Sequence, residues 1–174
     1  VGILSRTVTS LDLRDNRMDD QEAHILAGVL SECLSLTSLN LAGNRITASG
    51  VTSIAEALTT NTSHAHSVSV LDVSRNRLSN ELTTIATAVS NIILIGCLKA
   101  LSLNSALSFE EDGAELVTAF DPNMEPSAIM LTELRLRGNR LAASFAASLH
   151  NVIVKCPYLE LIDLSANMFF CEDG

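Results

Sequence analysis

The fold is decided by the stretch Leu36-Thr37-Ser38-Leu39-Asn40-Leu41-Ala42-Gly43-Asn44-Arg45-Ile46, whose skeleton L-x-x-L-x-L-x-x-N-x-L returns along the chain. Six copies begin near residues 8, 36, 68, 98, 131 and 159, so successive copies start 28 to 33 residues apart. The fourth copy departs from the skeleton, because Ala106 stands where the others have asparagine. Self-similarity at this period predicts a solenoid of about six repeats.

The skeleton itself predicts a short strand followed by a tight turn. Leu39 and Leu41 alternate with polar or small residues, which is the period of a strand with one buried face. The asparagine that follows has both a donor and an acceptor, so it can bond to the backbone of its own turn and of the neighbouring one. We therefore expect a structural asparagine ladder that consists of Asn16, Asn44, Asn76, Asn139 and Asn167.

The second half of each repeat predicts a helix, because apolar residues ten and fourteen positions after the asparagine share one helical face. These pairs are Leu26/Leu30, Ile54/Leu58, Leu116/Phe120 and Leu149/Ile153, and the third repeat has Ile85/Val89 one position early. Strands and helices that alternate at this period predict an α/β horseshoe with an inner parallel β-sheet and outer helices.

Residues 36–58 nearly complete the longer pattern L-x-x-L-x-L-x-x-N-x-L-x-x-x-G-x-x-x-L-x-x-x-L, which resembles the ribonuclease-inhibitor type of leucine-rich repeat. The resemblance extends from residue 8 to about residue 170. It implies a right-handed leucine-rich-repeat solenoid that binds proteins through its concave face and adjoining loops. We interpret residues 1–174 as a single domain of this kind. We expect it to be a segment of a longer protein, since neither end shows an obvious polar capping repeat.

Composition excludes several classes of function. The 174 residues are 47% hydrophobic and carry a formal net charge of −9, which argues against non-specific binding of nucleic acid. The sequence has no apolar run long enough for insertion in a membrane. Cys33, Cys97 and Cys156 each stand just before a repeat and are expected to be small buried thiols. Such thiols favour a reducing compartment, so we expect an intracellular, cytoplasmic location, with the cytoskeleton as one option.

Catalytic chemistry has little support in the sequence. His64 and His66 have no cysteine or carboxylate nearby at ligand spacing, and His24 and His150 fall on expected helices. There is no nucleophile motif and no glycine-rich phosphate loop. We therefore expect no enzyme activity, no metal, no cofactor and no small-molecule substrate.

The polar residues of the strands are the candidates for binding a protein on the concave face. They are Asp12, Arg14, Asn40, Asp72, Ser74, Asn104, Glu133, Arg135, Arg137 and Asp163. This strip becomes basic at Arg135 and Arg137, and arginine is favoured at binding hot spots. The alternative interpretation is a solvated face with ordinary alternation of charge.

A second candidate surface is a rim of arginines directly after the ladder asparagines, formed by Arg17, Arg45, Arg77 and Arg140. Such a row can bind an acidic partner, although it is also explained by long soluble side chains that cover the turns. Insertions at 59–67 and 121–130 fall on one edge of the solenoid and are further candidates. The acidic run at 110–115 is explained by its place at the start of a helix.

The leading functional hypothesis is a non-catalytic protein–protein interaction module or scaffold. Two narrower roles follow from the resemblance. One is regulation of an enzyme, as in a protein that resembles the Ran GTPase activator, although no activator motif can be matched residue by residue. The other is a cytoskeletal or ciliary scaffold that resembles tropomodulin. Fold alone does not choose between these roles.

Overall fold

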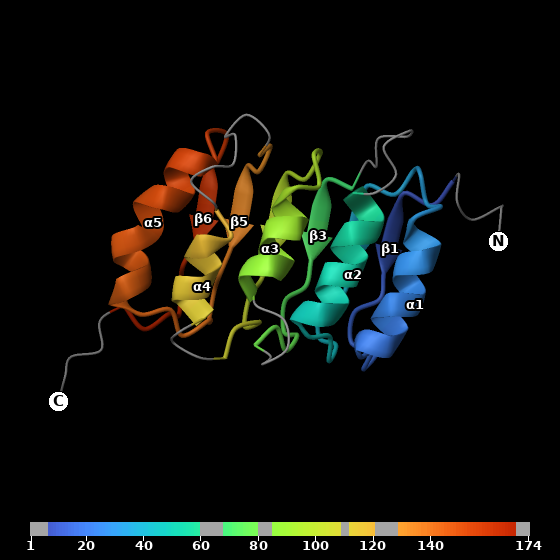
Figure 1. Ribbon diagram of the computed structural model, residues 1–174, viewed down its shortest axis with the longest axis horizontal. Helices are drawn as coiled ribbons and strands as arrows, with labels where there is room; N and C mark the ends of the chain where they lie inside the picture. Colours follow the sequence, from blue (N-terminus) through green and yellow to red (C-terminus); the bar gives the residue numbers. More distant parts are fainter. Residues whose placement is uncertain (1–6, 60–67, 80–84, 109–111, 121–128, 170–174) are drawn as a thin grey trace.

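The structure is a computed structural model, and it describes residues 7–59, 68–79, 85–108, 112–120 and 129–169. Within these residues six short strands alternate with five helices along the chain (Figure 1). The strands are β1 (Ser10–Asp12), β2 (Ser38–Asn40), β3 (Val70–Asp72), β4 (Ala100–Ser102), β5 (Glu133–Arg135) and β6 (Leu161–Asp163). The helices are α1 (Asp20–Leu30), α2 (Ala48–Thr59), α3 (Ile85–Ile93), α4 (Asp112–Thr118) and α5 (Ala143–Lys155).

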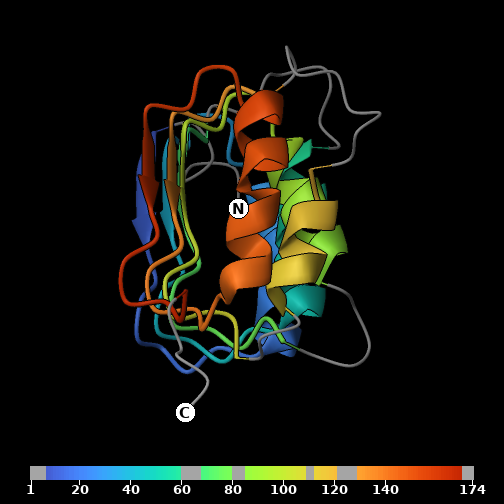
Figure 2. The ribbon, with the colours of Figure 1, turned by 90° about the vertical axis from the view of Figure 1, so that its left-hand side faces the viewer.

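The six strands form one parallel sheet in the order of the chain. The register is the same at every step, so Leu11, Leu39 and Leu71 are paired in a row that continues to β6. The helices lie on one face of the sheet and leave the other face uncovered, which we call the open face (Figures 1 and 2). This architecture confirms the predicted α/β solenoid of about six repeats.

Aliphatic side chains fill the space between the sheet and the helices. Leu39 and Leu41 are fully buried, whereas Leu11 and Leu13 are half-buried because β1 lies at the edge of the sheet. Full burial of one leucine side chain contributes about 1.5–3 kcal/mol. The repeated leucines therefore hold the strands against the helices.

The apolar pairs predicted for the helices lie in this core with one exception. The pairs of the second, third and fourth repeats are buried, namely Ile54/Leu58, Ile85/Val89 and Leu116/Phe120. In α5 the prediction is wrong for Ile153, which is 49% exposed. The inward stripe of α5 runs instead through Phe145, Leu149 and Val152, whose spacings of four and three residues define one helical face.

Asn44 shows how an asparagine connects two repeats. Its Oδ1 accepts the backbone N–H groups of Asn16 and Met18, both at 3.0 Å. Its Nδ2 donates to the carbonyl of Leu13 at 3.0 Å and to that of Leu41 at 2.8 Å. The buried side chain therefore satisfies backbone groups of its own turn and of the preceding repeat, which would be costly to leave unpaired.

Asn76, Asn139 and Asn167 likewise bond to the preceding repeat through both amide atoms. The fourth repeat has no such side chain, because Ala106 stands at this position. There the backbone carbonyl of Ala106 accepts the N–H of Leu78 at 3.1 Å. A backbone acceptor thus replaces the missing amide, and the stack of repeats continues across the gap.

The residue before each of these positions has a left-handed backbone conformation in all six repeats, with φ between 51° and 69°. These residues are Asp15, Gly43, Arg75, Ser105, Gly138 and Ala166. Because only two of the six are glycine, the turn stores some backbone strain at the other four. The same turn therefore follows every strand, whatever residue occupies it.

The three cysteines within the described residues lie just before β2, β4 and β6, and Cys33 and Cys156 are free thiols. Cys33 and Cys156 are buried, and Cys97 is half-buried with its Sγ 3.2 Å from the carbonyl oxygen of Val68. Burial raises the pKa of the Cys156 thiol to about 11. These thiols serve as compact packing groups and are poor nucleophiles at neutral pH.

Candidate functional site

The open face consists of three columns of side chains, because the leucines between them point to the core. From β1 to β6 the first column is Ser10, Ser38, Val70, Ala100, Glu133 and Leu161. The second column is Asp12, Asn40, Asp72, Ser102, Arg135 and Asp163. The third column is Arg14, Ala42, Ser74, Asn104, Arg137 and Ser165. Apart from Asp72 on β3, uncharged side chains occupy the middle of the face, and the charged ones lie toward its two ends.

Four side chains of the second column bond to their own backbone. The Oδ1 atoms of Asp12, Asn40, Asp72 and Asp163 accept the N–H two residues later, at 2.9 to 3.1 Å. Such bonds fix the chain where it leaves each strand. These four predicted contact residues therefore have a role in the fold, whatever they contribute to binding.

In repeats 4 and 5 the corresponding N–H groups bond to the preceding repeat instead. The N–H of Asn104 donates to Ser74 Oγ at 3.1 Å, and the N–H of Arg137 donates to Asn104 Oδ1 at 2.9 Å. Ser74 is only 6% exposed, so it offers almost no surface to a partner. We leave Ser74 out of the candidate site and keep Asn104, which is half-buried.

In repeats 5 and 6 the open face has two arginines, Arg135 and Arg137, whose surroundings differ. Arg135 Nη2 lies 2.6 Å from Glu133 Oε2, so the Arg135 guanidinium forms an ion pair with that carboxylate. Arg137 is exposed and forms no ion pair within the part of the chain that the structure describes. The Ser165 hydroxyl and N–H lower the pKa of Asp163, and the positive charges of Arg137 and Arg135 lower it further.

A groove of about 460 Å³ lies where the chain enters β4, β5 and β6. We call it the edge groove, and its lining residues are Lys99, Met130, Thr132, Pro157, Tyr158, Leu159 and Glu160. Met130 is 39% exposed and Tyr158 is 50% exposed. Both residue types are enriched where proteins bind one another. Sequence reasoning missed this groove, although Tyr158 is the one tyrosine of the chain.

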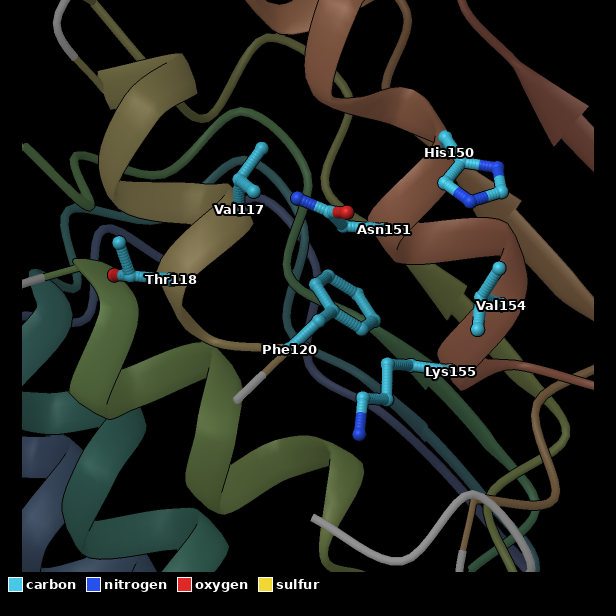
Figure 3. A pocket seen from close by; sticks show the side chains of 7 residues that line it. All are labelled: Val117, Thr118, Phe120, His150, Asn151, Val154 and Lys155. Carbon is cyan, nitrogen blue, oxygen red and sulfur yellow. The ribbon is translucent and has the colours of Figure 1, made fainter. Parts of the chain in front are cut away.

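A second hollow, of about 350 Å³, lies between α4 and α5 on the helical side. Figure 3 shows Val117 and Thr118 of α4 on one side and residues of α5 on the other, with Phe120 between them. Its walls are mostly apolar, and His150 and Lys155 lie at α5. The hollow exists because α4 is the shortest of the described helices and leaves α5 incompletely covered.

The predicted rim arginines Arg17, Arg45, Arg77 and Arg140 are all exposed. The first three belong to consecutive repeats, whereas Arg140 stands apart because the fourth repeat has the buried Leu107 at this position. The structure thus brings three of the four into one row.

Several predicted features fall outside the described residues. They include His64, His66 and most of the insertions at 59–67 and 121–130. Among the residues that are described, no group of three or more histidine, cysteine or carboxylate side chains could hold a metal ion. His24 and His150 are exposed on α1 and α5. None of the described helices has the length and apolar character needed to cross a bilayer.

Two segments of the chain, residues 4–21 and 32–55, match the family model described as Leucine Rich repeat. The second segment contains the stretch from Leu36 to Ile46 that repeats along the chain. A search of the curated proteins found no match. Taken with the six parallel strands and their alternating helices, the match shows that the fold is a leucine-rich-repeat solenoid.

Proposed function

We propose that this leucine-rich-repeat solenoid is a non-catalytic protein-binding module. Its binding site consists of the open face of repeats 5 and 6 together with the edge groove beside it. The observation that carries this proposal is that Arg137 and Met130 belong to the same repeat. Arg137 is exposed and forms no ion pair within the described chain. Met130 lies in the segment that enters β5 and lines the edge groove. Repeat proteins generally bind other proteins through such faces.

The composition of this surface supports a protein as the ligand. Arginine, tyrosine and methionine are enriched at protein interfaces, and here Arg137, Tyr158 and Met130 are exposed near the starts and ends of adjacent strands. Leu161, at the start of β6, adds an apolar side chain that is 40% exposed. The site thus combines apolar contact area with a charged group that can set orientation.

The hydrogen bonds of the scaffold also support the binding of a partner. Backbone N–H groups beneath the open face donate hydrogen bonds to the side chains of Ser74, Asn104 and Asn167, which fix the backbone there. A preorganised surface loses little conformational entropy when a partner binds. The site therefore requires no rearrangement to receive its ligand.

The experiment that tests this proposal is affinity capture from cells with the chain and with its R135E/R137E variant. We expect at least one protein to be retained by the first and lost from the second, while the circular dichroism spectrum is unchanged. Retention of the same proteins by both would contradict the proposed site. The retained protein also tests the two narrower roles, through GTP hydrolysis for a GTPase and co-sedimentation for actin or microtubules.

We further propose an intracellular location. The support for it is Cys33 and Cys156, which are free thiols three residues before the second and sixth repeats, since free thiols are typical of reducing compartments. Fractionation of cells with an antibody against the native protein tests this assignment.

A further inference from the structure

Three arginines stand at the same position in consecutive repeats, and we call Arg17, Arg45 and Arg77 the arginine rim. The backbone stacks them directly: the N–H of Arg45 donates to Met18 O at 2.7 Å, and that of Arg77 donates to Ile46 O at 2.9 Å. Neighbouring strands of a sheet are about 4.8 Å apart. The three residues therefore stand in one row along the same edge of the solenoid, although Arg17 has a left-handed backbone, with φ of 60°, that Arg45 and Arg77 do not share.

The arginine rim lies outside the ion pairs of the described chain, although the positive charge of Arg45 helps to lower the pKa of Asp19. All three residues are exposed, and none forms an ion pair with another described residue. Three like charges at this spacing repel one another.

Three carboxylates of the first repeat are bound to other groups. Asp15 pairs with Arg75, 3.3 Å from its Nη2. Asp20 accepts the N–H of Thr47 at 2.7 Å and its hydroxyl at 2.6 Å. Asp19 caps the N-terminus of α1 by accepting a backbone N–H. These bonds hold the acidic groups to the scaffold. The three guanidinium groups form no ion pair with them, and Arg45 acts on Asp19 through its charge alone.

We propose that the arginine rim receives an acidic segment, rich in aspartate or glutamate, of the protein partner. This inference rests on the proposed function and specifies the chemistry of that partner. Guanidinium groups bind carboxylates through paired hydrogen bonds, so a row of them fits a run of carboxylates. Exposed ion pairs are individually weak. The rim therefore speeds association and sets orientation, while the open face of repeats 5 and 6 supplies most of the affinity.

The test measures binding of a fluorescein-labelled peptide of ten glutamates by fluorescence anisotropy at low salt. The variant is R17Q/R45Q/R77Q, and the matched control is R140Q, which removes an exposed arginine at the same position of a distant repeat. For the triple variant we expect the dissociation constant to rise roughly tenfold, or about 1.4 kcal/mol for three exposed ion pairs. For R140Q we expect no change, and added salt should weaken binding to the unsubstituted chain.

Three results would overturn the inference. The first is that the triple variant and R140Q bind the glutamate peptide equally well. The second is that the unsubstituted chain binds a peptide of ten glutamines as tightly as the glutamate peptide. The third is that it binds heparin much more tightly through the rim, which would make a polysaccharide the better ligand. The R135E/R137E variant separates this inference from the proposed function. If it still binds the glutamate peptide but loses the captured partner, both proposals stand. If capture of the partner depends on Arg135 and Arg137 but neither the unsubstituted chain nor any variant binds the glutamate peptide, only the rim proposal fails.

Discussion

Arg75 and Asp15 form an ion pair that reaches across an intervening repeat: Arg75 Nη2 lies 3.3 Å from Asp15 Oδ1, although 60 residues separate them in sequence. Gly43 is the equivalent residue of the repeat between them, with φ of 68°. A Cβ at Gly43 would overlap the Asp15 carboxylate and lie 3.1 Å from Arg75 Nη2. Glycine is therefore favoured there by space as well as by the left-handed conformation, which the non-glycine residues of the other repeats adopt with some strain.

For Gly43→Ala we expect a loss of about 1–2 kcal/mol in the free energy of unfolding from the left-handed conformation alone. Displacement of the Asp15 carboxylate adds to this loss. Chemical denaturation measures the total, and the same substitution in an Asp15→Ala background removes the overlap. An equal loss in both backgrounds would show that the contact with Asp15 is irrelevant.

Gly50 and Gly28 form a matched pair for a second prediction. A Cβ at Gly50 would lie 2.6 Å from Ile46 Cγ2, whereas a Cβ at Gly28 meets nothing within 4 Å. Gly28→Ala should stabilise the chain by about 0.5–1 kcal/mol, because alanine is favoured over glycine within a helix. Gly50→Ala should instead destabilise it, because overpacking costs roughly 1–3 kcal/mol. Thermal unfolding of both variants compares them, and changes of the same sign would refute the packing described for α2.

The ladder asparagines allow a third comparison. Asn44→Ala leaves buried backbone groups of two repeats unpaired and should cost about 1–3 kcal/mol. Asn16 is exposed, and the bonds its side chain donates go to its own turn, to Leu13 O and Arg14 O. Asn16→Ala should therefore cost less, as measured by urea denaturation. Equal unfolding midpoints for the two variants would show that bonds between repeats contribute nothing.

A fourth prediction concerns the pKa of Asp163, which lies below the ordinary value of 3.8. The Ser165 hydroxyl is the largest cause, followed by the Ser165 N–H and by Arg137 and Arg135. Carboxyl titration by NMR should show a rise of this pKa in Ser165→Ala and a smaller rise in Arg137→Gln. Because folding lowers this pKa, the ionised group contributes stability above the unfolded value, and this contribution is lost as the pH falls through the folded value. A larger rise in Arg137→Gln would reverse the order of causes.

The fold could be predicted because the periodic leucines and asparagines report a local pattern that every repeat shares. Strand positions such as Leu39 follow from alternation alone, and helix faces follow from spacings of three and four. Ile153 was misassigned because the same helix offers two overlapping apolar stripes, and only packing beneath α5 selects the one through Val152. The hydrogen bond from Leu78 N–H to the carbonyl of Ala106 could not be predicted either, since the acceptor is a backbone carbonyl and not a side chain.

The candidate site could be predicted only in part. Arginines on the strands were visible from the alternation, but the burial of Ser74 depends on its bond to Asn104 in the next repeat. The edge groove brings Met130 and Tyr158 together from two repeats at the points where the chain enters β5 and β6. Such contacts are set by the paths of the connecting segments, which the repeat pattern does not specify.

Arg137 and Arg14 offer the most direct test of whether the open face of repeats 5 and 6 binds a protein. They occupy the same position in repeats 5 and 1 and are both exposed. With the partner identified by capture, isothermal titration calorimetry would compare Arg137→Glu with Arg14→Glu. We expect the first substitution to raise the dissociation constant at least tenfold, about 1.4 kcal/mol, and the second to leave it nearly unchanged. Equal affinity of the two variants, whether weakened or not, would contradict the account.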